Sequence, residues 1–133
     1  IYEDGNQVRD FVNIHDVVDA NIAVMEDQRA DYEMYNVGGG APITVNQFAS
    51  ACAEVYGVKN YQPKPCGKYR FGDTRHIWSD ISKLQSLGWE PQKTIYDSII
   101  EYKEWLSTAS SIDNIIEYCN KKMKELHVLR DIS

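Results

Sequence analysis

The sequence predicts a mixed α/β fold in which several helices pack against a small sheet. Alternating side chains near the N-terminus have the two-residue period of a strand. Apolar residues farther along recur every three or four positions, which is the period of an amphipathic helix. With 133 residues, the chain is long enough for one domain that buries roughly two thirds of its unfolded surface.

Residues 1–14 are expected to form a β-hairpin. Asp4-Gly5 has the chemistry of a tight turn, because glycine tolerates a positive φ angle and aspartate bonds its own backbone. The segment after this turn places three apolar side chains on one face: Val8, Val12 and Ile14. Arg9 would lie on the opposite face, where a charged side chain points either to solvent or into a cleft.

Helical and extended patterns share the rest of the chain. The expected helices are one with the buried stripe Val18, Ile22 and Met25, one opened by Thr44 and stopped by Gly57, a turn from Asp80 to Leu87, one capped by Thr94 with Ile95, Ile99, Tyr102 and Leu106, and an amphipathic tail opened by Ser111. Short strands are expected at 33–37 and 76–79. An internal boundary after residue 106 would separate a main domain, residues 1–106, from a helical tail, residues 107–133.

The chain is acidic, with a net charge of −6. A general nucleic-acid binder needs a dominant basic surface, so we expect no nucleic-acid partner. The sequence has neither an apolar run of membrane-spanning length nor a signal-peptide pattern, so we expect no membrane contact. Cys52, Cys66 and Cys119 are widely spaced and odd in number, which favours reduced thiols and a cytoplasmic location. The strand pattern begins directly at Ile1, which indicates a piece of a longer protein.

Gly38-Gly39-Gly40 follows an extended pattern but does not complete a dinucleotide site. Such a site needs G-x-G-x-x-G, and Ile43 stands at the third glycine position. We therefore interpret the glycine run as a tight turn. No residues pair a nucleophile with its base in a known motif, and no cluster has metal-ligand spacing. We expect no catalytic residue and no metal site in this chain.

The loop over residues 67–76 contains three cations and one histidine. Arginine donates hydrogen bonds in pairs to phosphate oxygens, and Gly72 lets the backbone come close to a ligand. Such a loop suits a diphosphate. From the residues alone, the alternative is a solvated loop whose arginines pair with nearby carboxylates.

Five short motifs occur in one order along residues 1–106. They are Tyr2-Glu3-Asp4-Gly5 with Arg9-Asp10-Phe11-Val12, then Tyr35-Asn36-Val37-Gly38-Gly39, Arg70-x-Gly72-Asp73, Asp80-Ile81-Ser82-Lys83 and Leu87-Gly88-Trp89-x-Pro91. Together they resemble the substrate domain of extended short-chain dehydrogenase/reductases, the family of NAD-dependent nucleotide-sugar epimerases and dehydratases. The tail and Gly67-Lys68-Tyr69-Arg70 resemble the dTDP-L-rhamnose 4-epimerase branch, in which glycine usually stands where this chain has His127.

The resemblance implies a fold and a set of site residues. The fold would be the C-terminal substrate domain of such an enzyme, without its Rossmann half. Arg9 and Arg70 would clamp the nucleoside diphosphate, Asn36 would contact the sugar-nucleotide, and Asp73 would bond the ribose region. In this family the NAD-binding turn and the catalytic Tyr-x-x-x-Lys pair lie upstream of these segments. NAD would therefore belong to the parent protein only, and the isolated chain would be inactive.

The partners implied by the resemblance are a dTDP-, UDP- or GDP-linked hexose and a second copy of the chain in a homodimer. The leading interpretation is binding of a nucleotide-sugar for epimerisation, in which hydride is removed from and returned to sugar C4. One alternative is a nucleotide-sugar 4,6-dehydratase. Another is a non-catalytic interaction module of the same fold, with the tail helix as a docking surface.

Overall fold

The computed structural model describes residues 1–109 and 115–132. Its elements, in chain order, are β1 (Val8–Asp10), α1 (Ile14–Glu26), the 3₁₀ turn η1 (Gln28–Ala30), β2 (Pro42–Thr44), α2 (Val45–Val55), β3 (Lys68–Arg70), α3 (Ser82–Gln85), α4 (Ile95–Ser107), α5 (Ile116–Glu125) and β4 (Leu129–Asp131). β1 pairs with β2 and β3 pairs with β4, both antiparallel. The predicted mixed α/β class, with small sheets and packed helices, is confirmed.

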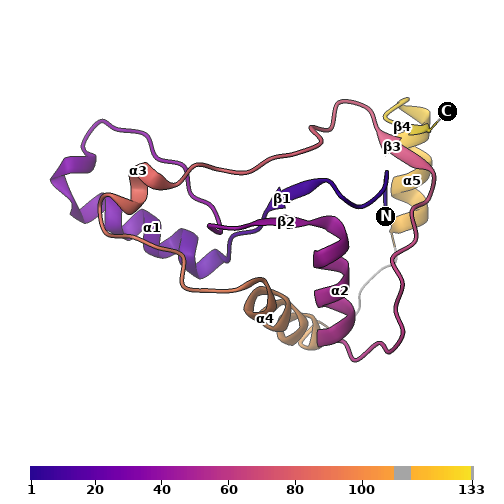
Figure 1. Cartoon of the computed structure of the whole chain (residues 1–133), viewed down its shortest axis with the longest axis horizontal. Coiled ribbons are helices and arrows are strands. Elements are labelled where there is room, and N and C mark those ends of the chain that lie inside the picture. Colours follow the sequence, from indigo (N-terminus) through magenta and orange to yellow (C-terminus); the bar gives the residue numbers. More distant parts are fainter. Residues whose placement is uncertain (110–114, 133) are drawn as a thin grey trace.

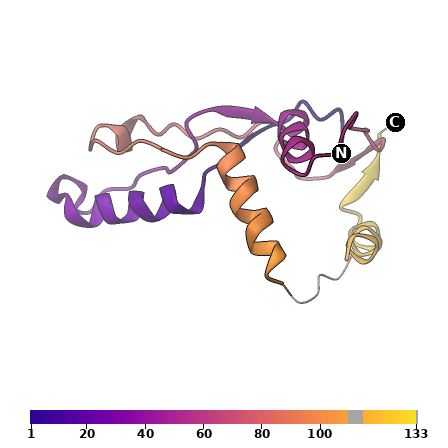
Figure 2. The same cartoon turned by 90° about the horizontal axis from the view of Figure 1, so that it is seen from below.

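The elements are spread along an extended molecule rather than gathered around one sheet. α1 and α3 lie at one end, whereas β3, β4 and α5 lie at the other (Figure 1). The β1–β2 pair lies between these two ends, and α4 runs down from beneath it in the view of Figure 2. Residues far apart in sequence therefore meet mainly through loops, and these loops position the candidate site.

The expected hairpin over residues 1–14 is wrong. Its turn does form, because the Asp4 carboxylate accepts the amide of Asn6 at 2.9 Å. The two arms pair with distant segments instead of each other. β1 pairs with β2, and the Glu3 amide donates to the Lys68 carbonyl oxygen at 2.7 Å. The turn residues determine a local reversal, whereas the strand partners come from the tertiary fold.

The expected strands at 33–37 and 76–79 are also wrong. Both segments run between helices or turns without strand geometry. The Ile77 amide donates to the Val8 carbonyl oxygen at 3.2 Å, but a strand needs a repeated ladder of such bonds.

Close packing, rather than a dinucleotide site, explains the glycine run after residue 37. A Cβ atom on Gly39 would lie 1.9 Å from the carbonyl oxygen of Phe11, so this position has no room for a side chain.

The core lies where α1 meets α3 and the segment after it. Ala20, Ile81, Leu84 and Trp89 are buried together, with partly buried residues packed around them: Ala23, Val24, Tyr35, Val37 and Leu87. This burial gains about 25 cal/mol per Å² of apolar surface that leaves water.

The predicted buried stripe of α1 is wrong, although the helix itself is confirmed. Val18 and Ile22 are each 48% exposed, and Met25 is 84% exposed. The buried positions of α1 are instead Asp16 and Ala20. Asp16 is buried because its carboxylate accepts two backbone amides, those of Gln92 and Lys93, both at 3.0 Å. The helix therefore turns Asp16 and Ala20 toward the core, and the side that carries Val18, Ile22 and Met25 faces outward.

The caps of the two longer later helices are as predicted. Thr44 accepts the amide of Gln47 at 3.1 Å, and the Gln47 side chain accepts the Thr44 amide, which completes a capping box before α2. Thr94 has a capping box of its own with Asp97 before α4. α2 packs against α4. Phe48 stacks on Phe11 at 4.5 Å between ring centroids, which joins α2 to the segment after β1.

α3 is a short helix within the predicted turn from Asp80 to Leu87. The Asp80 carboxylate accepts the Ser82 amide at 2.9 Å, but the N-cap residue is Ile81, whose side chain makes no cap hydrogen bond, so the expected N-cap at Asp80 is wrong by one residue. Gly88 follows with φ of +97°, a left-handed conformation that favours glycine at a helix end.

The tail ends in a strand that the sequence did not reveal. Ser111, expected to open the tail helix, lies outside the described residues. α5 is followed by β4, which pairs with β3. His127 lies between them with φ of +57°, and the Val128 amide donates to the Met123 carbonyl oxygen at 2.9 Å. His127 therefore occupies the left-handed position that usually holds glycine. The division after residue 106 stays a prediction.

Candidate functional site

Arg9, Arg70 and Asp73 meet around one carboxylate. Nη2 of Arg70 lies 2.6 Å from Oδ2 of Asp73, and Nη2 of Arg9 lies 4.0 Å from the same oxygen. Arg9 comes from the centre of β1 and Arg70 from the end of β3, so two unconnected strands bring the two guanidinium groups together. Three of the four residues predicted for substrate binding are thus in one place.

The turn after β3 sets the position of Asp73. Gly72 has φ of +90°, which glycine adopts without strain, and the Asp73 amide donates to the Arg70 carbonyl oxygen at 3.2 Å. This reversal folds the Asp73 carboxylate back onto Arg70. The side chain of Arg70 is 42% exposed and that of Asp73 is 33% exposed. The cluster is accessible from solvent, so a ligand can reach it.

Arg9 is held more firmly than Arg70. Its Nη1 donates to the carbonyl oxygens of Val8 at 2.8 Å and Arg75 at 2.9 Å, and its side chain is 26% exposed. Two main-chain acceptors on different segments fix the guanidinium plane. The Nη2 end remains directed at Asp73 and the open side of the cluster. Arg9 therefore points into the site rather than lying free in solvent.

The other cations of the 67–76 loop are engaged elsewhere. Arg75 donates to Glu3 at 2.5 Å and to Asp4 at 2.7 Å, and Lys68 pairs with Asp131. Hydrogen bonds from the Arg75 guanidinium and, to a smaller extent, from the Asn6 amide lower the pKa of the Asp4 carboxyl from 3.8 to about 2. All three cations of the loop thus pair with carboxylates, as the alternative had it: Lys68 and Arg75 away from Arg9, and Arg70 with Asp73 beside it. Of the loop's three cations, Arg70 is the one that faces Arg9.

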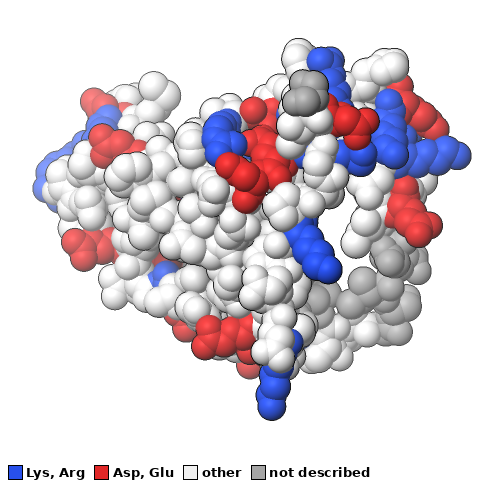
Figure 3. All heavy atoms as spheres, turned by 45° about the vertical axis from the view of Figure 1, so that its right-hand side comes forward, with Lys and Arg blue, Asp and Glu red and all other residues white. Residues whose placement is uncertain are grey.

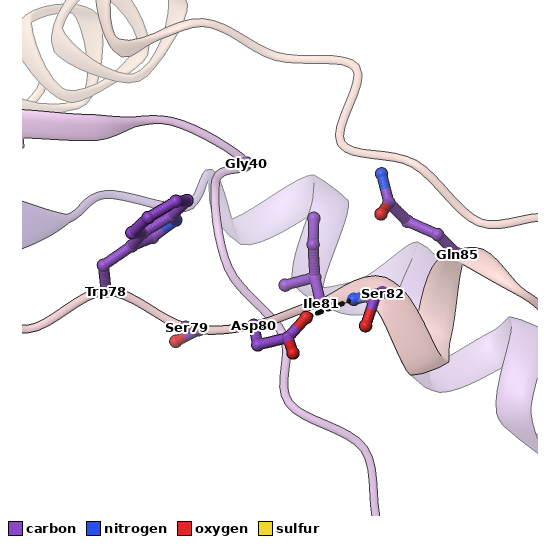
Figure 4. A pocket seen from close by; sticks show the side chains of 7 residues that line it. All are labelled: Gly40, Trp78, Ser79, Asp80, Ile81, Ser82 and Gln85. Carbon is purple, nitrogen blue, oxygen red and sulfur yellow. Dashed lines mark hydrogen bonds between the residues drawn. The ribbon is translucent and has the colours of Figure 1, made fainter.

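Asn36 lies apart from this cluster. Its Nδ2 donates to the Asp80 carbonyl oxygen at 3.3 Å. Asp80 lines a hollow of about 400 Å³ with six other residues: Gly40, Trp78, Ser79, Ile81, Ser82 and Gln85. Figure 4 shows Trp78 and Gln85 on opposite sides of this hollow, with Ile81 and the Asp80–Ser82 hydrogen bond between them. The structure therefore places the fourth predicted residue beside a second concavity.

Asp10 is a site-forming residue that the sequence interpretation missed. Its Oδ1 accepts the Gly39 amide at 2.8 Å and its Oδ2 accepts the Ser79 amide at 3.0 Å. One carboxylate thus ties β1 to the glycine run and to the segment before α3. A Cβ atom on Gly38 would lie 2.3 Å from Oδ2 of Asp10, so the close approach requires glycine. The signal available in the sequence was the acidic residue directly after Arg9, combined with an unexplained glycine run.

Tyr2 is the second residue that the sequence did not indicate. Its ring lies under the Arg70 guanidinium, with 5.5 Å from Cζ to the ring centroid. Cation–π contacts act within about 6 Å of the centroid. No local spacing links Tyr2 to Arg70, because the two residues are joined only by the tertiary fold.

The expectation of no catalytic pair overlooked one spacing match. Tyr118 and Lys122 on α5 have the Tyr-x-x-x-Lys spacing. Tyr118 is 67% exposed, and Nζ of Lys122 donates to Glu125 at 3.1 Å. These side chains lie on the solvent side of a surface helix, so the match in spacing brings neither of them to the Arg9–Arg70 cluster.

Charges of both signs lie next to each other at the end of the molecule that carries β3 and β4 (Figure 3). That pattern differs from the uniform basic face of a nucleic-acid binder. Among residues 1–109 and 115–132, no three histidine, cysteine, aspartate or glutamate side chains are grouped closely enough to hold a metal ion. Within the same ranges, every helix is too short or too polar to cross a bilayer.

Comparison with known proteins identifies the class to which this fold belongs. Residues 1–38 match the model of the NAD-dependent epimerase/dehydratase family. A dTDP-L-rhamnose 4-epimerase from Burkholderia thailandensis is 36% identical over 108 residues, which cover 80% of this chain and 29% of that protein. A putative UDP-glucose 4-epimerase from Methanocaldococcus jannaschii is 32% identical and is matched over 33% of its length.

Solved structures agree with this result. The UDP-glucose 4-epimerase of Thermotoga maritima, solved with UDP-glucose, superimposes with a TM-score of 0.69 at 36% identity and covers 80% of this chain. The Bifidobacterium longum UDP-glucose 4-epimerase, solved with NAD⁺ and UDP, gives a TM-score of 0.64 at 30% identity. The chain belongs to the NAD-dependent epimerase/dehydratase family and corresponds to the C-terminal part of these enzymes. It spans about a third of the length of the relatives that it matches.

Proposed function

We propose that this chain supplies the nucleoside-diphosphate-binding wall of an NAD-dependent nucleotide-sugar 4-epimerase. The observation that carries the proposal is the convergence of Arg9 and Arg70 on one oxygen of Asp73, at 4.0 and 2.6 Å. Two guanidinium groups within reach of one small anion are also within reach of the two linked phosphates of a nucleoside diphosphate. Each charge-assisted contact of this kind contributes about 1.5–3 kcal/mol.

Asp73 has a second role in this proposal. In the free protein it holds the two arginines near each other, and a diphosphate would compete for the same donors. A ribose hydroxyl is a donor, so the carboxylate can accept a hydrogen bond from it once the phosphates occupy the guanidinium groups. Asn36 would contact a more distant part of the nucleotide-sugar, which fits its place beside the hollow lined by Trp78 and Gln85.

The residues of this chain do not fit a binding site for NAD. The glycine run lacks the third glycine of the fingerprint, and Gly38 and Gly39 are explained by the close approach of Asp10 and Phe11. NAD accepts and returns hydride in the proposed reaction, and it would be held by a part of the protein outside this chain. The role left to this chain is to hold the substrate by its diphosphate while the sugar reacts.

The assignment is tested by supplying the intact protein with NAD and separately with dTDP-, UDP- and GDP-linked hexoses. Nuclear magnetic resonance of the product then distinguishes the outcomes. A sugar inverted at C4 supports the proposal. A 4-keto-6-deoxy sugar would identify a dehydratase instead. If the protein shows no turnover and binds no nucleoside diphosphate, the result would favour the interaction module.

We also propose that the protein associates with itself. Val18, Ile22 and Met25 present an apolar side of α1 that the described residues do not cover. Contiguous apolar surface of this kind marks contact sites. Light scattering on the intact protein should give the mass of a dimer. A single monomeric species over the micromolar range would contradict this proposal.

A further inference from the structure

Arg70 is supported from two sides. Asp73 binds one side of its guanidinium, and the Tyr2 ring lies against it at 5.5 Å. The backbone of Arg70 is fixed as well, because Arg70 lies opposite Leu129 in the β3–β4 pair, and Leu129 is 7% exposed. These contacts are all made by groups of the protein itself.

Tyr2 in turn is held by residues from both ends of the chain. Its hydroxyl donates to Oδ1 of Asn120 at 3.0 Å, and Asn120 belongs to α5. Its carbonyl oxygen accepts Nε2 of Gln7 at 3.0 Å, and Gln7 is 5% exposed. The backbone of Tyr2 is therefore held by the buried Gln7 amide, and its ring is held at the hydroxyl by α5.

An arginine side chain loses substantial rotamer entropy when it is ordered. A ligand that binds a freely moving arginine must overcome that loss, whereas a pre-ordered arginine binds without it. The Tyr2–Asn120 hydrogen bond links this ordering to α5. The C-terminal segment thereby acts on a cation that would contact substrate, although α5 itself is outside the cluster.

We propose that Tyr2 is a positioning residue for Arg70 and that Asn120 fixes Tyr2, so that α5 sets the affinity of the protein for a nucleoside diphosphate. This inference rests on the proposed function and deepens it. It assigns Tyr2 and Asn120 an indirect role: neither touches the diphosphate, and both act through the orientation of the Arg70 guanidinium.

The test combines spectroscopy of free Arg70 with binding of dTDP. The intact protein, labelled with ¹⁵N-arginine, is prepared as wild type, Tyr2→Leu, Tyr2→Phe and Asn120→Leu. An aromatic ring shifts the resonances of a proton held over its face, so Tyr2→Leu should move the Arg70 Nε–Hε signal and Tyr2→Phe should leave most of the shift. The Kd for dTDP should rise about threefold to tenfold in Tyr2→Leu, because both the ring contact and the ordering are lost. Asn120→Leu and Tyr2→Phe should give smaller rises.

Tyr96 supplies the matched control. Tyr96 lies on α4 and its hydroxyl donates to Glu54 of α2 at 3.0 Å, away from β3, so Tyr96→Leu and Tyr96→Phe remove a comparable bond without approaching Arg70. Both should leave the Arg70 signal and the Kd unchanged. In an Arg70→Ala background, Tyr2→Leu should have no further effect on binding.

The outcomes separate the two proposals. If Arg70→Ala weakens binding but Tyr2→Leu changes neither the signal nor the Kd, the positioning role is wrong and the proposed function stands. If Tyr2→Leu weakens binding equally with and without Arg70, Tyr2 acts directly on the ligand and the inference is overturned. If Arg70→Ala leaves the Kd unchanged, the diphosphate assignment itself fails.

Discussion

Arg70 and Asp73 form an ion pair of 2.6 Å across a turn of the chain, and the carboxylate of that pair lies where the proposed ligand would place its negative charge. The pair holds the Arg70 side chain in place. It also opposes any anion that approaches, since like charges repel. The effect of Asp73 on binding should therefore depend on whether the anion carries a ribose.

Asp73→Asn should separate these two effects. Removing the carboxylate charge should strengthen binding of inorganic pyrophosphate about fivefold, which corresponds to roughly 1 kcal/mol for charges a few ångströms apart near a surface. Binding of dTDP should gain less or weaken, because the variant amide replaces the strong acceptor for the ribose hydroxyl. Calorimetric titration with both ligands measures the ratio. An equal gain for pyrophosphate and dTDP would show that Asp73 does not contact ribose.

Asp16→Ala should destabilise the protein severely. The Asp16 carboxylate is 2% exposed and accepts two main-chain amides, and its loss leaves both donors unsatisfied next to the core. Hydrogen bonds to a charged acceptor contribute about 1.5–3 kcal/mol each, so the free energy of unfolding should fall by about 3 kcal/mol or more. Urea denaturation followed by circular dichroism measures it. The control is Asp19→Ala on the exposed side of the same helix, and equal losses in the two variants would contradict the role given to Asp16.

Asp4 should make the stability of the protein depend on pH at the acid end. Its folded-state pKa of about 2 lies below the ordinary value of 3.8, so the ionised form is favoured by folding. The contribution is therefore fully present above about pH 4 and is lost as the pH falls toward 2. Wild type should be more stable than Asp4→Asn at pH 5, and the difference should shrink toward pH 2.

The partner of Asp4 provides the control for that experiment. The chief cause of the lowered pKa is the hydrogen bond from Arg75. In an Arg75→Ala background, Asp4→Asn should change the acid limb of the stability profile much less, because only the hydrogen bonds from Asn6 then lower the pKa of Asp4. An undiminished difference between those two variants would assign the pKa shift to another group.

His127→Gly should stabilise the end of α5. His127 has φ of +57°, a conformation that costs a residue with a side chain about 1–2 kcal/mol, part of which is offset by the greater freedom of glycine in the unfolded chain. The net gain should be about 0.5–1 kcal/mol in thermal unfolding. His127→Ala serves as the comparison, because it shortens the side chain without relieving the backbone. Equal stabilities of the glycine and alanine variants would contradict this account.

Local features of the fold could be predicted from the sequence. The caps at Thr44 and Thr94 depend on residues three positions apart, so the relevant physics lies within one turn of chain. These predictions were confirmed.

Features that depend on distant partners could not be predicted in this way. The hairpin prediction failed because each arm bonds a segment far along the chain, as Glu3 does with Lys68. The predicted buried stripe on α1 was wrong because Asp16 is buried by hydrogen bonds from amides 76 and 77 residues away. The spacing of apolar residues carries no information about such distant partners. Hydrophobic spacing identified the helix but not which side of it faces the core.

The candidate site was predictable only through family resemblance. Spacing alone left open whether Arg9 and Arg70 point to solvent or toward a ligand. The order of the five motifs is what predicted that they act as a pair. Asp10 and Tyr2 were missed because their roles are to hold other residues, which appears only in the hydrogen bonds and ring contacts of the folded chain. The binding roles of Arg9, Asn36, Arg70 and Asp73 stay predictions.

The most direct test of the central claim is calorimetric titration of dTDP into the intact protein and into Arg9→Ala, Arg70→Ala and Arg29→Ala. Arg29 pairs with Asp27 at the far end of the molecule and serves as the matched control. If Arg9 and Arg70 share one diphosphate, each of their substitutions should raise the Kd tenfold or more, and Arg29→Ala should leave it unchanged. A Kd that is the same in all four proteins would contradict the claim that these two arginines bind the substrate.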